Sequence, residues 1–95
     1  MIVGTVQARL HLQGVGSLKE KRSIIKSLIG RLKSRFNISI SEVDHNDSKT
    51  SAVIGISITG NATGFIDSQL DSVISFMRRD GRFYLGHIER ETFNT

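Results

Sequence analysis

Hydrophobic and polar residues alternate along the first segment of the chain, from Ile2 to Leu12. Every second position holds Ile, Gly, Val, Ala or Leu, and most positions between them hold Thr, Gln, Arg or His. A period of two with one apolar face is typical of a β-strand that is covered on one side. Glycines at positions 14 and 16 interrupt the pattern, so we expect a turn there.

The next segment has the spacing of an amphipathic helix. Ser17 and Glu20 match a capping box, in which the serine caps the helix and the glutamate reaches back. Apolar residues then recur every three or four positions and form one stripe, which consists of Leu18, Ile25, Leu28, Ile29 and Leu32. We expect this helix to run to about Ser34.

Two more alternating segments follow, at residues 36–41 and 52–59. The connection between them contains the short polar stretch 44–48, so we expect the two strands to pair as an antiparallel hairpin.

A second amphipathic helix is expected after the turn at Gly60 and Asn61, with Asn61 as its cap and Gly81 as its stop. Its apolar stripe consists of Ile66, Leu70, Val73, Ile74 and Met77. The last strand is expected from Phe83 to about Phe93, with a bulge at Gly86.

The predicted order of elements is therefore β-α-β-β-α-β. Right-handed crossovers favour a ferredoxin-like α+β sandwich, in which a four-stranded antiparallel sheet carries both helices on one face and leaves the other face open. A chain of 95 residues is too short for two independent cores, so we expect a single domain over residues 1–95.

Composition narrows the class of protein. Cysteine is absent, which excludes disulfides, thiolate metal ligands and a cysteine nucleophile. No apolar run approaches 18 residues, and Met1 leads directly into the first strand. We therefore expect a cytoplasmic protein with no membrane span, no signal peptide and no cofactor.

The positive charge is concentrated in one element. The chain carries a net charge of +4, but the segment from Ser17 to Arg35 carries seven basic residues against the single acid Glu20, a net +6. The rest of the chain has six basic and eight acidic residues, a net −2. An asymmetry of this kind indicates an anionic partner more strongly than the total charge does.

Helical geometry places Lys19, Arg22, Lys26 and Lys33 within a sector of roughly 60°. Arg31 lies further round the helix. Lys21 lies near the apolar arc, where its aliphatic chain would have to extend along apolar surface for the ammonium group to reach water. A solvated face that only keeps the protein soluble is the alternative, but such a face ordinarily mixes charges of both signs. We predict that the nucleic-acid-binding residues are Lys19, Lys21, Arg22, Lys26, Arg31 and Lys33.

The open face of the predicted sheet offers a second candidate surface. The two central strands carry no aromatic residue there, so the base stacking of an RNA-recognition motif is not expected, and Tyr84 is the sole candidate stacker. A flat face of small residues also suits the packing of two sheets in a homodimer.

Two loops are candidate chemical sites. Leu12-Gln13-Gly14-Val15-Gly16 resembles the acylphosphatase loop V-Q-G-V-x-F-R, but Ser17 and Leu18 stand where that family has its phenylalanine and its phosphate-binding arginine. We therefore expect no catalysis of that type, although the loop amides could bind an anion. Asp44, His45 and Asp47 lack the spacing of a metal site, and turn formation alone explains them.

The segment Ser17-Leu18-Lys19-Glu20-Lys21-Arg22, followed by a helix ending in Arg31-Leu32-Lys33-Ser34-Arg35-Phe36-Asn37, resembles the YlxP-like bacterial family of unknown function. Further matches lie at residues 41–43, 53–55, 60–62 and 88–91. The resemblance implies a ferredoxin-like domain without an assigned activity. Genes of this family tend to lie beside those for translation initiation and ribosome maturation factors, which implies work near ribosomal RNA.

Our leading hypothesis is a non-catalytic accessory protein whose partner is RNA or a ribosomal subunit. The first alternative is a homodimeric interaction module that uses the open sheet face, and the second is an acylphosphatase-like hydrolase.

Overall fold

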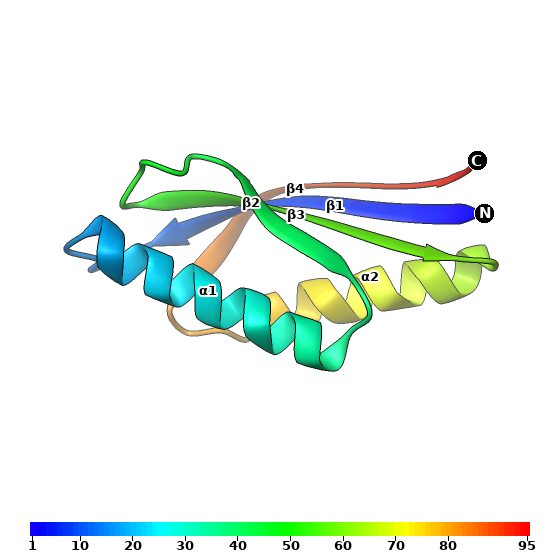
Figure 1. Ribbon diagram of the computed structural model, residues 1–95, viewed down its shortest axis with the longest axis horizontal. Coiled ribbons are helices and arrows are strands. Elements are labelled where there is room, and N and C mark those ends of the chain that lie inside the picture. The colour runs from blue at the N-terminus through cyan, green and yellow to red at the C-terminus, as the bar shows by residue number, and fades with distance from the viewer.

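Six elements follow one another in the computed structural model, which describes residues 1–95. They are β1 (Ile2–Leu12), α1 (Leu18–Arg35), β2 (Ser39–Asp44), β3 (Ser51–Gly60), α2 (Thr63–Arg78) and β4 (Phe83–Asn94). The strands form one antiparallel sheet in the order β2-β3-β1-β4. Figure 1 shows both helices on one side of this sheet. The predicted ferredoxin-like α+β architecture is confirmed.

The core lies between the sheet and the two helices. The alternation of β1 is confirmed, because Val6, Ala8, Leu10 and Leu12 are all buried on the helix side. The helix stripes meet them with Ile25, Leu28 and Leu32 from α1 and with Ile66, Leu70, Val73 and Met77 from α2. Helix α2 approaches β1 so closely that a Cβ atom on Gly4 would collide with the side chain of Ile66.

Two predicted boundaries are wrong. Strand β2 spans Ser39–Asp44 rather than residues 36–41, because Phe36 and Ile38 pack against the core before pairing with β3 begins at Ser39. Helix α2 is preceded by Ala62, which provides no side-chain cap, so Asn61 is not the N-cap. The bulge in β4 is confirmed, because its register with β1 shifts between Ala8 and Leu10.

The two ends of the chain lie side by side at one end of the sheet (Figure 1). The Thr95 backbone N–H donates to the Met1 carbonyl over 2.8 Å, and the Met1 amino group donates to the Thr95 carbonyl.

Neither α1 nor α2 combines the length and the hydrophobicity that crossing a bilayer requires.

Candidate nucleic-acid interface

The N-terminus of α1 is capped as the sequence predicts. Ser17 Oγ accepts a hydrogen bond from the Glu20 backbone N–H over 3.1 Å. Glu20 reaches back one residue further than in a standard capping box, because its Oε2 accepts from the Gly16 N–H over 3.0 Å. A carboxylate therefore already occupies this amide of the Gly14–Gly16 loop, which reduces what the loop can offer to an external anion.

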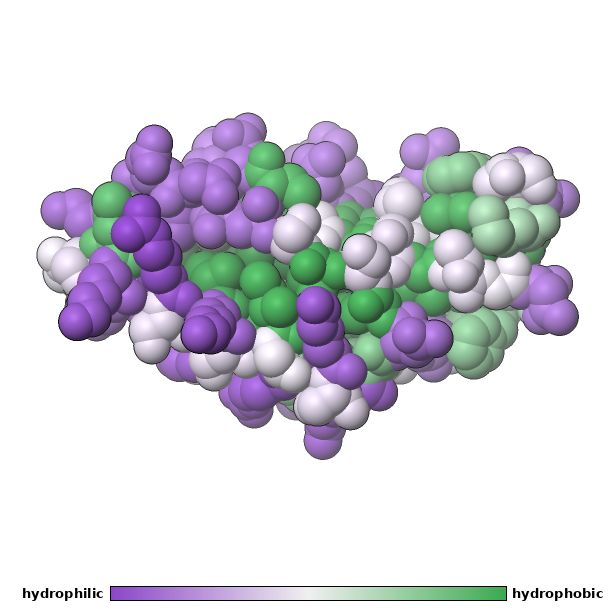
Figure 2. Space-filling view, in the orientation of Figure 1, coloured by the Kyte–Doolittle hydropathy of each residue, from purple (hydrophilic) through white to green (hydrophobic).

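Four cations of α1 stand exposed on one flank of the helix. We call Lys19, Arg22, Lys26 and Lys33 the basic ridge; all four side chains are exposed, and none forms an ion pair with a carboxylate. Figure 2 shows hydrophilic side chains projecting on the α1 side of the molecule, with apolar surface visible between them and the sheet. The structure thus gathers these four predicted site residues on one surface, with their charges unneutralised by neighbouring acids.

Lys21 does not belong to this surface. Its side chain is completely buried, and its Nζ lies 2.9 Å from Glu42 Oε2 and donates to the His45 carbonyl over 2.6 Å. Because this ammonium group already has two partners inside the protein, the prediction of Lys21 as a phosphate-binding residue is wrong. The helical periodicity already placed Lys21 near the apolar arc, but it gave no sign of the carboxylate partner on β2.

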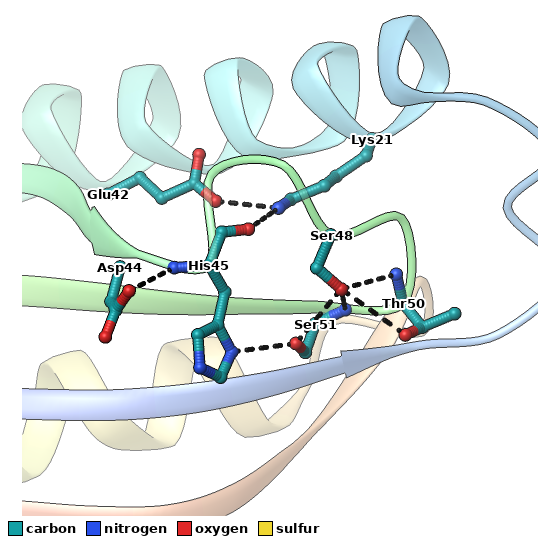
Figure 3. A network of polar contacts seen from close by, with 7 residues as sticks. All are labelled: Lys21, Glu42, Asp44, His45, Ser48, Thr50 and Ser51. Atoms are coloured by element: carbon teal, nitrogen blue, oxygen red, sulfur yellow. Dashed lines mark hydrogen bonds and ion pairs between the residues drawn. The ribbon is translucent and has the colours of Figure 1, made fainter.

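Lys21 instead ties α1 to the connection between β2 and β3 (Figure 3). His45, whose carbonyl Lys21 binds, has a φ of +61°, a left-handed conformation that is uncommon for residues other than glycine. The His45 ring is held in turn, because its Nδ1 lies 2.9 Å from Ser51 Oγ. The hydrogen bond from Lys21 therefore stabilises a loop whose backbone has an unfavourable conformation.

Arg31 lies on the opposite flank of α1 from the basic ridge, where α1 faces α2. Its guanidinium stacks over the Phe76 ring, with Cζ 5.2 Å from the ring centroid, and Nη1 lies 3.7 Å from Asp80 Oδ2. Arg31, Arg35 and Arg79 together line a pocket between the C-terminal ends of α1 and α2. The sequence did not single out these two arginines as partners of Arg31, because only the packing of the helices brings them together.

Asp80 is held chiefly by Arg82, the residue two positions later. Arg82 donates to the Asp80 carboxylate from Nη2 over 2.6 Å and from Nε over 3.0 Å. This hydrogen bonding lowers the pKa of Asp80 from its ordinary value and raises the pKa of Arg82. Both groups therefore stay charged at neutral pH, and Asp80 is largely committed to Arg82 rather than to Arg31.

The open face of the sheet holds a shallow hollow of about 570 Å³. Its floor consists of small side chains from the central strands and β2, among them Thr5, Ser39, Ser41, Gly55 and Ser57, and the carboxylates of Glu89 and Glu91 lie along the β4 side. Tyr84 lies on the edge strand β4 and stacks on His11, with their ring centroids 5.1 Å apart. Arg90 also lines the hollow but is paired with Asp71, so Glu89 and Glu91 are the unneutralised charges at its border.

The polar loop between β2 and β3 does not bring three metal-binding side chains together. His45 bonds to Ser51, and Asp44 accepts the backbone N–H of His45 over 2.7 Å. No group of three or more His, Cys, Asp and Glu side chains that could hold a metal ion occurs in the structure.

Comparison with known proteins places the chain in a family. The model of the family described as "Protein of unknown function (DUF503)" matches residues 3–90. The chain belongs to this family. It is also similar to a protein of Bacillus subtilis (strain 168) described as "Uncharacterized protein YlxP", with 29% identity over 76 residues, which cover 80% of this chain and 83% of that protein. The resemblance inferred from the Ser17–Arg22 segment is thereby confirmed, and the family is one without an assigned activity.

Proposed function

We propose that this protein is a non-catalytic accessory protein that binds RNA, in free form or within a ribosomal subunit, through the basic ridge. The observation that carries this proposal is that Lys19, Arg22, Lys26 and Lys33 are exposed on one flank of α1 without a carboxylate partner. Phosphate groups are the abundant anions that such a row of cations attracts, and release of counterions from RNA would drive the association.

The mode of binding follows from the side chains on the surface. Lysine and arginine on an exposed helix supply charge and hydrogen-bond donors, which position a phosphate backbone without reading its sequence. The central strands carry no Phe, Tyr or Trp on the open face, and the His11 ring there is already stacked on Tyr84, so the proposed binding does not depend on base stacking at this face. The proposed binding is therefore electrostatic and depends steeply on salt.

Charge reversal tests the proposal. In a filter-binding assay at low salt with a structured ribosomal RNA fragment, the variant Lys19→Glu/Arg22→Glu/Lys26→Glu should bind roughly a hundredfold or more weakly than the unmodified protein. The matched control is Arg9→Glu/Lys49→Glu/Arg78→Glu, which changes the net charge equally at exposed cations off the ridge. Circular dichroism should show that both variants keep the fold.

Two outcomes would contradict the proposal. One is that the unmodified protein shows no detectable binding to structured RNA at low salt. The other is that the control variant loses as much affinity as the ridge variant, because net charge alone would then explain the binding.

A second candidate function is a homodimeric interaction module, and a specific feature of the open face favours it. Three of the five large hydrophobic side chains that are exposed, Val43, Tyr84 and Phe93, lie on this face, and Val43 lines the hollow floored by small residues. Large apolar side chains exposed on the same face of a sheet favour an interaction surface there. Light scattering would detect a dimer, and Ser57→Arg should dissociate it; a monomer at high protein concentration would exclude this candidate.

A further inference from the structure

A pocket of about 310 Å³ lies between the C-terminal ends of α1 and α2, on the opposite flank of α1 from the basic ridge. We call it the arginine pocket, after the three arginines in its lining, which consists of Arg31, Arg35, Phe76, Arg79, Asp80 and Gly81. Residues from two helices and the turn after α2 build it, so it is a product of tertiary packing rather than of one basic segment.

The charges around the arginine pocket are not balanced. Asp80 is the only carboxylate in its lining, and Arg82, outside the lining, makes its two short hydrogen bonds. Arg31 approaches Asp80 only to 3.7 Å, while Arg35 and Arg79 form no ion pair at all. The pocket therefore holds an excess of positive charge that no group of the protein neutralises.

Phe76 orients two of the three guanidinium groups. The Cζ atoms of Arg31 and Arg35 lie 5.2 and 5.0 Å from the centroid of its ring, within the range of cation–π contacts. The ring is itself buried and packs edge-to-face on Phe36, so it forms a fixed platform. Arginines held this way lose less conformational freedom when a ligand binds than free surface arginines do.

The helix dipoles explain only part of this arrangement. Helix α1 ends at Arg35 and α2 ends at Arg78, and cations in the last turn of a helix are favourable there. The dipole favours a cation near each end, but it does not require three guanidinium groups to converge around one hollow. A ligand with negative charge and several acceptor oxygens gives that convergence a physical reason.

We propose that the arginine pocket binds a phosphate group of the RNA whose backbone the basic ridge also contacts. The planar guanidinium group matches the oxygens of a phosphate in a bidentate geometry, and two such groups converge from α1 while the third comes from the end of α2. This inference rests on the proposed function and adds to it a second phosphate site with its own residues.

The positions of the two surfaces narrow the class of RNA. The basic ridge and the arginine pocket lie on opposite flanks of a helix that is roughly 10–12 Å across with its side chains. Base-paired RNA offers two phosphate backbones on either side of a wide, shallow minor groove, whereas a single strand would have to cross over the helix. The ligand is therefore base-paired RNA, with one backbone on each flank of α1.

Fluorescence anisotropy with a labelled stem-loop RNA, measured over a range of salt concentrations, tests this inference. The pocket variant Arg35→Gln/Arg79→Gln should bind roughly tenfold more weakly at about 0.1 M salt for each phosphate that it no longer neutralises, and the slope of log K against log salt should fall by about 1 per phosphate. The matched control, Arg9→Gln/Arg78→Gln, removes two exposed arginines that do not line the pocket. A single strand of the same length should bind more weakly than the stem-loop to the unmodified protein.

The results separate this inference from the proposed function. The pocket proposal is overturned if the pocket variant and the control have the same affinity at every salt concentration. If charge reversal of the basic ridge abolishes binding at the same time, the RNA-binding proposal stands. Equal affinity for the single strand and the stem-loop would overturn the assignment to base-paired RNA. If the unmodified protein binds neither RNA at low salt, both proposals fall together.

Discussion

Lys19 and Lys21, two lysines near the start of α1, have entirely different surroundings for their charged groups. Lys19 is exposed and unpaired, whereas Lys21 is buried between Glu42 and the carbonyl of His45. The first can therefore contribute to binding and the second to folding, although they stand two positions apart in the same basic segment. Residue type and sequence position alone do not distinguish these two roles.

Replacement of Lys21 by methionine should cost about 3 kcal/mol of unfolding free energy, because it leaves the largely buried Glu42 carboxylate without a counter-charge. Urea denaturation would measure this, with Lys19→Met as the control, for which we expect a change within about 0.5 kcal/mol. The double variant Lys21→Met/Glu42→Leu should recover part of the loss. Equal stability of the two single variants would contradict the structural role of Lys21.

Asp80 provides a pH-dependent contribution to stability. Because hydrogen bonds from Arg82 lower the pKa of Asp80 below its ordinary value of 3.8, its contribution is complete above that pH and is lost as the pH falls through the lowered value. We expect Asp80→Asn to cost about 1–2 kcal/mol at neutral pH, and less and less at pH values below 3.8. Denaturation at several pH values would measure the difference.

Asp71→Asn is the control for this prediction. Its carboxylate is also within 2.6 Å of an arginine, Arg90, but is exposed, so the change should stay within about 1 kcal/mol. A cost of Asp80→Asn that stays constant down to the lowest pH would show that Asp80 does not act through its charge.

At the scale of elements, the pattern of hydrophobic and polar residues predicted which side chains are buried. It predicted less well which residues form the hydrogen bonds between strands. Phe36 and Ile38 face the core as their alternation indicates, but they precede β2, because strand pairing depends on where β3 offers a partner. The apolar stripes of both helices were recognisable for the same reason, since burial follows local periodicity. Contacts between elements, such as the pair of Lys21 and Glu42, depend on the register and packing of distant segments.

Two glycines, Gly30 in α1 and Gly4 in β1, differ in the space that surrounds them. A Cβ atom on Gly30, in the middle of α1, would meet nothing within 4 Å, so Gly30→Ala should stabilise the protein by about 1 kcal/mol through helix propensity. Gly4→Ala should instead destabilise it by about 1–3 kcal/mol, because α2 packs directly on that position of β1. Thermal unfolding would compare them, and the same sign for both would contradict the packing described.

On the scale of the whole molecule, most unpaired cations lie on the helical side, although Arg9 is exposed on the open sheet face. Cations stand on both flanks of α1, while the hollow of the open sheet face is bordered by Glu89 and Glu91. Under the proposed function, RNA would be attracted to the helical side, and the sheet side would stay available to a protein partner. One molecule can in this way serve both of its candidate functions.

The extent of the basic surface was only partly predictable from the sequence. The sector of Lys19, Arg22, Lys26 and Lys33 follows from helical geometry, since all four lie on one helix. The arginine pocket does not, because Arg35 and Arg79 meet only through the packing of α1 against α2. Residues on one face of a single helix can be predicted from their spacing in the sequence. A site formed by two elements can be predicted only when the arrangement of those elements in space is known.

The salt dependence of RNA binding by the unmodified protein tests the central claim most directly. If the four cations of the basic ridge contact phosphates, the slope of log K against log salt should be about −3 to −4 from the ridge alone, and steeper with the arginine pocket. Anisotropy titrations of a stem-loop RNA from about 50 to 200 mM salt would measure it. A slope near zero, or no binding at the lowest salt, would contradict the claim that α1 binds RNA through its exposed cations.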